Sequence, residues 1–419
     1  MREMKDSGIE WIGEIPSHWE TLANKHLMKK VKNIRTKYTG EDVLSLTMRG
    51  VIVRDLDNPS GKMPATFDGY QFVEAGNLLM CLFDIDVTPR CIGLIKNDGV
   101  CSPAYSQFHL FENADAGYYY YYYLHLDNTK ELLHLAKNLR HSLTEEQLGF
   151  IPTVHPPIHE QRKIVAFLDK KLSQVDTLIC NVQAQIEKLK AYKQSLITEM
   201  VTKGLDPTVP MKDSGVEWIG EIPKTWNTIR LKQLLKERKE RSVDGSEEPL
   251  SMSQKLGLVP TRMMDMVPNM ASSFVGAKLA YIDDLVFNKL KAHLGVFSVS
   301  KYDGLVSPDY AVYYSTGKVH LKYLEYLFKT PQCISEFRKR STGIAAGLTR
   351  LYTDGLFAIE CPFPDMDEQV AIVDYLNKKC SHIDQLIAIK QTKIEKLEQY
   401  KRSLIYEYVT GKKEVPAHT

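Results

Sequence analysis

Basic side chains are concentrated in two short stretches, and lysine and arginine are the residues that contact the phosphate oxygens of nucleic acid. The first basic strip consists of Lys25, Lys29, Lys30, Lys32, Arg35 and Lys37. The second basic strip consists of Arg230, Lys232, Lys236, Arg238, Lys239 and Arg241. A run of charge alone is usually a solvated surface. The two strips, however, lie at corresponding positions in the two halves of the chain, which otherwise differ in sequence. This recurrence favours phosphate contact.

A further basic group lies late in each half of the chain. In the second half it consists of Arg338, Lys339, Arg340 and Arg350. Lys137 and Arg140 occupy the corresponding stretch of the first half. The formal net charge of the chain is only +2, so bulk charge does not by itself indicate a nucleic-acid partner.

The sequence lacks the motifs that would support catalysis. Ser102-Pro103-Ala104-Tyr105 and Ser307-Pro308-Asp309-Tyr310 invite comparison with the Ser-Pro-Pro-Tyr type of motif in adenine amino-methyltransferases, but the third proline is missing. No glycine-rich loop for S-adenosylmethionine follows a predicted strand, and no GxxxxGK[ST] loop for ATP occurs. We interpret both Ser-Pro pairs as turns that open a strand. The expectation is a chain with no catalytic residues and no bound cofactor of its own.

Cysteine and histidine usage points the same way. The seven cysteines include no CxxC pair, and the 12 histidines show no metal-ligand spacing with them. We therefore expect no metal site. No apolar run is long enough to span a bilayer and no N-terminal signal pattern occurs, so we expect a cytoplasmic protein with no membrane partner.

A long amphipathic helix dominates the middle of the sequence, within residues 158–204. Its apolar residues alternate in steps of four and three, the spacing of a coiled-coil seam. The predicted seam consists of Leu168, Leu172, Val175, Ile179, Val182, Ile186, Leu189 and Leu196. Gly204 and Pro207 end the pattern. An exposed seam of this length requires a partner.

The partner is a second copy of the helix within residues 365–411. Glu160-Gln161 returns as Glu368-Gln369, and Ile-Glu-Lys-Leu at 186–189 returns at 394–397, both at an offset of 208 residues. The second predicted seam consists of Leu376, Ile383, Ile387, Ile394, Leu397 and Leu404. Polar residues interrupt the seams at Lys193, Lys390 and Lys401. They either fix the register of the pair or extend to solvent along the helix surface.

A start motif is duplicated as well. Residues 4–19 recur at 211–226 with 13 of 16 positions identical, and all four tryptophans lie in these two copies. We interpret the tryptophans as core anchors of their own domains. The chain is therefore a tandem duplication of start motif, variable body and long helix.

The two bodies, roughly residues 20–155 and 227–362, have diverged further than the flanking segments. Short apolar runs at 77–83 and 285–287 predict strands, and 118–124 and 323–328 predict helices. The predicted class is α+β, with two tandem-duplicated α/β domains separated by a long two-helix coiled coil. Only residues 205–210 join the first helix to the second start motif, so the helix pair must be antiparallel.

These features together resemble the specificity subunits of type I restriction–modification enzymes. The resemblance rests on Ser-Gly-Ile-Glu-Trp-Ile-Gly-Glu-Ile-Pro at 7–16, on Pro-Pro-x-x-Glu-Gln at 156–161, and on Tyr-Lys-x-Ser-Leu-Ile at 192–197. Arg-x-Ser-Leu-Thr at 140–144 is similar to the family's loop before the helix, and residues 343–353 occupy that place in the second half. In the second half Cys-Pro-Phe-Pro at 361–364 departs from the usual proline pair, which puts fine docking there in doubt.

The resemblance implies target-recognition domains at 1–157 and 211–364, long helices at 158–204 and 365–411, a linker at 205–210 and a tail at 412–419. It implies that each domain reads one half of a bipartite, asymmetric site in double-stranded DNA. It also implies two modification subunits, which bind S-adenosylmethionine and methylate adenine N6, and restriction subunits that use ATP and Mg²⁺. Base contacts are expected from Arg140, Ser142, Thr349 and Arg350.

Two other functions compete with this interpretation. The chain could be a non-enzymatic coiled-coil scaffold that spaces two protein-binding heads, and it would then show no salt-dependent affinity for DNA. A self-contained methyltransferase is disfavoured by the missing cofactor loop.

Overall fold

The computed structural model describes residues 2–59, 61, 63–136, 141–254, 256–264, 273–345 and 348–416, without the side chains of residues 344, 345 and 348. The chain divides into two compact units. The first comprises Met1–Gln183 and Thr392–Thr419, and the second comprises Ala184–Gln391. Among the described residues no helix is long and apolar enough to cross a membrane.

The first body is built on a four-stranded antiparallel sheet with smaller strand pairs around it. The sheet order is β4 (Met28–Val31), β11 (Ser106–Leu110), β8 (Leu78–Met80) and β9 (Ile92–Leu94). The pairs are β1 (Met4–Asp6) with β2 (Glu14–Pro16), β3 (Glu20–Ala23) with β12 (Pro152–His155), β5 (Leu44–Thr47) with β6 (Gly50–Val53), and β7 (Gln71–Val73) with β10 (Gly99–Cys101).

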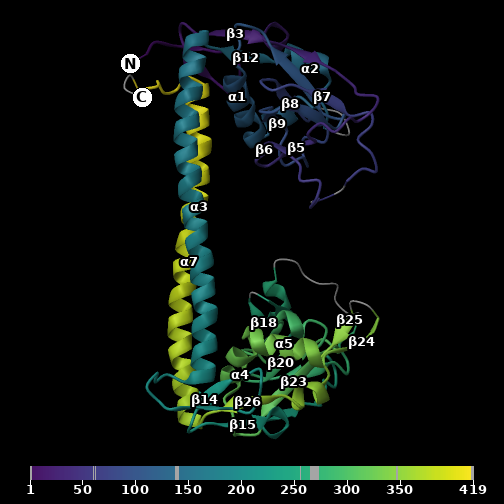
Figure 1. Cartoon of the computed structure of the whole chain (residues 1–419), viewed down its shortest axis with the longest axis vertical. Helices are drawn as coiled ribbons and strands as arrows, with labels where there is room; N and C mark the ends of the chain where they lie inside the picture. The colour runs from purple at the N-terminus through teal and green to yellow at the C-terminus, as the bar shows by residue number, and fades with distance from the viewer. Residues whose placement is uncertain are drawn as a thin grey trace. The chain divides into compact units, whose positions relative to one another are not determined.

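Helix α1 (Ala116–Thr129) lies between this sheet and the long helix α3 (Ile158–Lys203) in Figure 1. Asp115 caps its N-terminus by accepting a hydrogen bond from the Tyr118 amide. Five tyrosines of the run are buried in the core, namely Tyr118, Tyr119, Tyr121, Tyr122 and Tyr123. The shorter helix α2 (Glu145–Phe150) begins at Thr144, which forms a capping box with Gln147.

The second body repeats this strand order. The four-stranded sheet runs β16 (Leu235–Glu237), β23 (Tyr310–Ser315), β20 (Leu285–Asn288) and β21 (Phe297–Val299). The pairs are β13 (Met211–Asp213) with β14 (Glu221–Pro223), β15 (Asn227–Arg230) with β26 (Glu360–Phe363), β17 (Leu250–Ser253) with β18 (Gly257–Pro260), and β19 (Lys278–Ala280) with β22 (Gly304–Val306). A further hairpin joins β24 (Thr342–Ala345) to β25 (Leu348–Arg350).

The helices of the second half are α4 (Leu321–Phe328), α5 (Pro331–Arg340), α6 (Thr353–Phe357) and α7 (Met366–Val409). The mixed helix and strand content predicted from the sequence is confirmed. The expected strand at 77–83 is shorter than predicted, because only residues 78–80 pair. The two Ser-Pro pairs form turns before β11 and β23, as expected. Identical strand order shows that the bodies are duplicates although their sequences have diverged.

The long helices pack against each other in opposite directions within each unit. In the first unit the rings of Phe167 and Tyr408 lie 4.5 Å apart, and Asp176 is ion-paired to Lys401. In the second unit Lys390 Nζ is 2.6 Å from Gln185 Oε1, and Lys193 Nζ is 2.6 Å from Asp384 Oδ2. In each unit, as the residue number increases along α3, the number of the contacting residue on α7 decreases. The two helices are therefore antiparallel.

The predicted seam residues are buried or half-buried in both helices. The fully buried ones are Leu168, Leu172, Val175, Val182, Ile186, Leu196, Leu376, Ile383 and Leu404. The half-buried ones are Ile179, Leu189, Ile387, Ile394 and Leu397. All three lysines that interrupt the seams reach a polar side chain of the opposite helix. This geometry favours a role in register over simple extension to solvent.

Each body's core is completed by the end of a long helix that belongs to the other half of the sequence. Leu404, Ile405, Tyr408 and Val409 at the end of α7 are buried in the first body's core. Leu196, Ile197 and Val201 at the end of α3 are buried in the second body's core. Tyr118 Oη donates to the Val409 carbonyl at 2.7 Å, and Tyr323 Oη donates to the Val201 carbonyl at 2.9 Å.

The repeated Glu-Gln pair joins the start motif, the body and the long helix. Glu160 Oε2 accepts from the Trp19 indole at 3.1 Å, and Glu368 Oε2 accepts from the Trp226 indole at 2.7 Å. Trp19 and Trp226 are among the largest fully buried side chains, so the predicted role of the tryptophans as core anchors is confirmed for these two. Trp11 and Trp218 are half-buried and pack against the same two cores.

The neighbouring glutamine fixes the helix that follows the sheet. Gln161 Oε1 accepts from the Asp115 amide at 2.8 Å, and Gln369 Oε1 accepts from the His320 amide at 2.8 Å. Each glutamine is completely buried. In the second half Asp365 accepts from the Glu368 amide at 2.8 Å, so the altered proline sequence still allows a capped helix start.

Removing the ion pair between the two long helices should give a small coupling energy. Lys193→Ala and Asp384→Ala, combined in a double-mutant cycle, should couple by about 0.2–1 kcal/mol, because the Asp384 side chain is 57% exposed. The measurement is the free energy of urea unfolding of the full chain. The control cycle pairs Asp384→Ala with Lys188→Ala, an exposed α3 lysine, and should show no coupling. Equal coupling in both cycles would contradict a specific pair.

A methyl group at Gly411 should destabilise the first unit more than one at Gly8. Both glycines have positive φ, +70° and +71°, but a Cβ at Gly411 would lie 2.4 Å from Pro16, whereas one at Gly8 has no atom within 4 Å. Gly8→Ala should cost about 1–2 kcal/mol. Gly411→Ala should cost about 2–5 kcal/mol, because overpacking adds to the backbone strain. Urea unfolding measures both, and equal losses would mean that the contact with Pro16 relaxes freely.

Candidate nucleic-acid interface

Apart from Lys25, the first basic strip lies on β4 and the segment after it. Lys29 and Lys37 are exposed, whereas Lys30 is ion-paired to Glu145 at the start of α2. The guanidinium of Arg35 lies 4.6 Å from the centre of the Phe72 ring and 3.9 Å from Glu41. Lys29 and Lys37 are therefore more accessible to a ligand than Lys30 and Arg35.

The second basic strip contains one arginine that serves the fold. Arg238 Nε and Nη2 donate to Asp284 at 2.6 and 2.9 Å, and the guanidinium also lies within 5 Å of the Tyr281 and Tyr314 rings. The Asp284 carboxylate is buried, and its hydrogen bonds raise the pKa of Arg238. Lys239 and Arg241 are exposed. Arg238 thus holds β16 to the turn before β20.

The basic group at the end of α5 also has a structural explanation. Lys339 and Arg340 pair with the buried Glu336 at 2.8 and 3.5 Å, while Arg338 is exposed. Cations in the last turn of a helix interact favourably with its dipole. This group can still attract an anion, but its position does not require one.

The predicted base-reading residues precede α2 and α6 in the sequence. Arg140 lies outside the described residues. The Leu143 amide donates to the Leu82 carbonyl at 2.8 Å, and the Leu351 amide donates to the Lys289 carbonyl at 3.0 Å. Ser142 and Arg350, which precede Leu143 and Leu351, therefore occupy equivalent positions in the two bodies.

Thr349 and Arg350 lie on β25, and Arg350 Nη2 is 3.3 Å from Asp309 Oδ1. Asp309 belongs to the Ser-Pro-Asp-Tyr turn, so that turn and the loop before α6 meet at one surface. Lys278 and Lys289, which the sequence analysis did not select, lie beside the same turn. A repeat alignment could have found Lys278, because Gln71 stands in its place in the first body.

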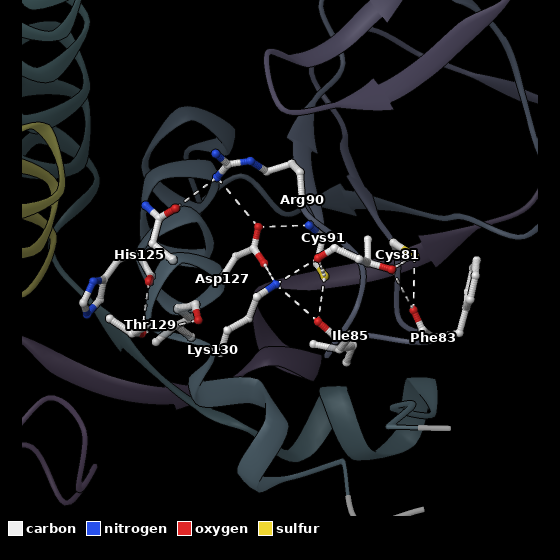
Figure 2. A network of polar contacts seen from close by, with 12 residues as sticks. Cys81, Phe83, Ile85, Arg90, Cys91, His125, Asp127, Thr129 and Lys130 are labelled. Carbon is white, nitrogen blue, oxygen red and sulfur yellow. Dashed lines mark hydrogen bonds and ion pairs between the residues drawn. The ribbon is translucent and has the colours of Figure 1, made fainter. Parts of the chain in front are cut away.

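A buried carboxylate in the first body could suggest chemistry, but its partners are structural (Figure 2). Asp127 accepts from the Cys91 amide at 2.9 Å and from Lys130 Nζ at 3.0 Å, and Arg90 lies 3.7 Å away. Lys130 also donates to the carbonyls of Ile85 and Thr88. Burial raises the pKa of the Cys91 thiol to about 12, which makes it a poor nucleophile. The network joins the end of α1 to the edge of the sheet.

The described part of the chain contains no assembled metal site. No group of three or more histidine, cysteine, aspartate or glutamate residues there could hold a metal ion. The exposed basic side chains at the surfaces described above, such as Lys29, Lys239 and Arg338, are of the kind that binds phosphate oxygens.

Comparison with known proteins identifies the relatives of the chain. No protein-family model matches the sequence. The putative type I restriction enzyme MjaX specificity subunit of Methanocaldococcus jannaschii is 25% identical over 426 residues, covering 96% of this chain and 95% of that protein. The MjaVIII specificity subunit of the same organism is 25% identical over 275 residues, which is 61% of each chain.

Two solved structures share the fold. One is a chain from a study of complex assembly and conformational transition of the type I R-M system, with a TM-score of 0.69, 14% identity and coverage of 94% of this chain and 98% of that chain. The other is the HsdS subunit from Thermoanaerobacter tengcongensis, with a TM-score of 0.51, 15% identity and coverage of 95% and 98%. The chain is a relative of the type I specificity subunits.

The basic residues of the chain are of two kinds. Some form ion pairs that stabilise the fold, and others are exposed and available to bind a ligand. Arg238 is of the first kind and its neighbour Lys239 is of the second.

Arg238→Gln should therefore lower the free energy of unfolding by about 3 kcal/mol or more, since it leaves the buried Asp284 carboxylate without its partner. Lys239→Gln, the matched control one residue away, should change it by less than about 0.5 kcal/mol. Thermal and urea unfolding of the full chain measure both variants. Equal stabilities would show that Arg238 is as dispensable as an exposed lysine.

Proposed function

We propose that this chain is the DNA sequence-specificity subunit of a type I restriction–modification complex. One observation carries the proposal: the two bodies share one strand order but have different side chains at equivalent surface positions. At equivalent places the first body has Lys30 paired with Glu145, whereas the second has Glu237 accepting from Thr353 at 2.8 Å. A duplicated scaffold with unlike surfaces suits the reading of two unlike half-sites.

In this proposal residues 1–157 and 211–364 are two target-recognition domains, each contacting one half of a bipartite site in double-stranded DNA. The helices at 158–204 and 365–411 form an antiparallel coiled coil that spaces these domains and docks two modification subunits. The antiparallel contacts within each unit support this arrangement. The chain itself is non-catalytic. S-adenosylmethionine belongs to the modification subunits, and ATP and Mg²⁺ belong to restriction subunits.

The names of the relatives support the same assignment, because the MjaX protein is called a specificity subunit and matches nearly the whole chain. The competing function, a scaffold that spaces two protein-binding heads, has less support. It gives no reason for exposed basic residues at equivalent places in both bodies, such as Lys29 and Lys236 or Lys32 and Lys239.

Exchanging one body should change one half of the recognised site. Residues 20–155 are replaced by the equivalent region of a relative, and the chimaera is expressed with its modification subunits. Glu160, Gln161 and Val409, which contact the start motif and the first body, lie outside the exchanged segment and are kept. Sequencing of methylated DNA should show one half-site altered and the other unchanged.

The matched control exchanges residues 227–362, and it should alter the opposite half-site. Alteration of both half-sites by either exchange would contradict independent reading by the two domains. If the unmodified chain with its modification subunits directs no sequence-specific methylation and binds no DNA, the scaffold function replaces the proposal.

A further inference from the structure

A cluster of cations surrounds Lys278 in the second body. Lys278 opens β19, is half-buried, and donates one hydrogen bond from Nζ to the Tyr310 carbonyl at 2.6 Å. Arg241 forms a backbone bridge with Lys278, and its Nη1 donates to the Gly276 carbonyl at 2.8 Å. Lys289 follows Asn288, which pairs with Tyr310 in the sheet. Lys289 and Arg241, from two other segments, lie close enough to Lys278 for their charges to act on its ammonium group.

The nearby acids do not balance these charges. Glu237 accepts from Thr353 at 2.8 Å, and Asp309 lies 3.3 Å from Arg350. Among the described residues, and counting Arg350, four cations share the site with two carboxylates, both of which have partners. Burial and the charge of Lys289 lower the pKa of Lys278, as expected where a cation lacks sufficient counter-charge.

The first body shows that the fold does not require the charge. Gln71 occupies the place of Lys278, is completely buried, and donates from Nε2 to the Tyr105 carbonyl at 2.7 Å and the Ser102 carbonyl at 3.0 Å. Leu82 stands in the place of Lys289, and Ala104 in the place of Asp309. A neutral amide thus satisfies the same backbone acceptor. The lysine carries a desolvation cost that the glutamine avoids.

We propose that Lys278 and Lys289, assisted by Arg241, form a binding site for a DNA backbone phosphate that only the second body possesses. The inference rests on the proposed function and deepens it. Lys278 keeps two N–H bonds beyond the one that Tyr310 accepts, and ammonium and guanidinium groups form their strongest hydrogen bonds with anionic oxygens. A phosphate oxygen supplies the missing negative charge. The contact positions the second body on the duplex and leaves base reading to other side chains.

The test compares Lys278→Gln and Lys289→Gln in the full chain assembled with its modification subunits. Lys278→Gln introduces the residue of the first body and keeps a donor for the Tyr310 carbonyl. Lys318→Gln, an exposed lysine in the loop after β23, makes the same charge change outside the cluster and is the control. Binding is measured over a range of salt concentrations, on a duplex carrying the methylated site and on one of unrelated sequence.

Each cluster variant should reduce the slope of log K against log salt by about 0.9, the value for one phosphate contact, on both duplexes. The methylated sequence should stay unchanged, and Lys318→Gln should keep the original slope. If both cluster variants unfold at the same midpoint as the parent chain and keep its slope, the phosphate site is overturned. The proposed function would then remain intact. A weaker affinity for the methylated site alone would show base reading and would also overturn the phosphate site. If the complex with the unmutated chain does not bind DNA at all, both proposals are overturned.

Discussion

Burial of the helix ends is the constraint on which the rest of the structure depends. Neither body completes its core from its own contiguous sequence, because Val409 closes the first body and Val201 closes the second. The tyrosine hydroxyls that meet these two carbonyls, from Tyr118 and Tyr323, are the same device used twice. Folding of the first body therefore requires the last helix of the chain, so the duplicated halves are interdependent although they are tandem in sequence.

This interdependence explains where the sequence has been kept and where it has changed between the repeats. Glu160, Gln161 and Trp19 and their counterparts act at the junction between start motif, body and helix, where one geometry serves both halves. Away from the junction, main-chain hydrogen bonds fix the segments that precede α2 and α6. The amides of Leu143 and Leu351 bind carbonyls of the neighbouring strand end, whatever side chain precedes them. Surface residues such as Ser142 and Arg350 can differ without altering the backbone.

The sequence predicted those features that repeat or that have a regular period. The seam of four and three steps predicted both long helices, because a helix buries every third or fourth residue. The prolines and the repeated Glu-Gln pair placed the helix starts to within two residues. It could not locate the strand register of the bodies, where most strands are three or four residues long. It also could not separate Arg238 from Lys239, since the partner Asp284 is 46 residues away in the chain. Lys278 was missed because a single lysine in a short strand carries no pattern of its own.

At one pair of equivalent positions the two bodies satisfy the same backbone carbonyl with different side chains. Tyr105 and Tyr310 present equivalent carbonyls, yet one receives a buried amide and the other a half-buried ammonium. A substitution that preserves the hydrogen bond but adds charge costs desolvation energy without improving the fold. Such an exchange is expected only where the added charge meets a ligand. With the proposed phosphate site in the second body alone, attachment to DNA and reading of DNA would be divided unequally between two domains of the same fold.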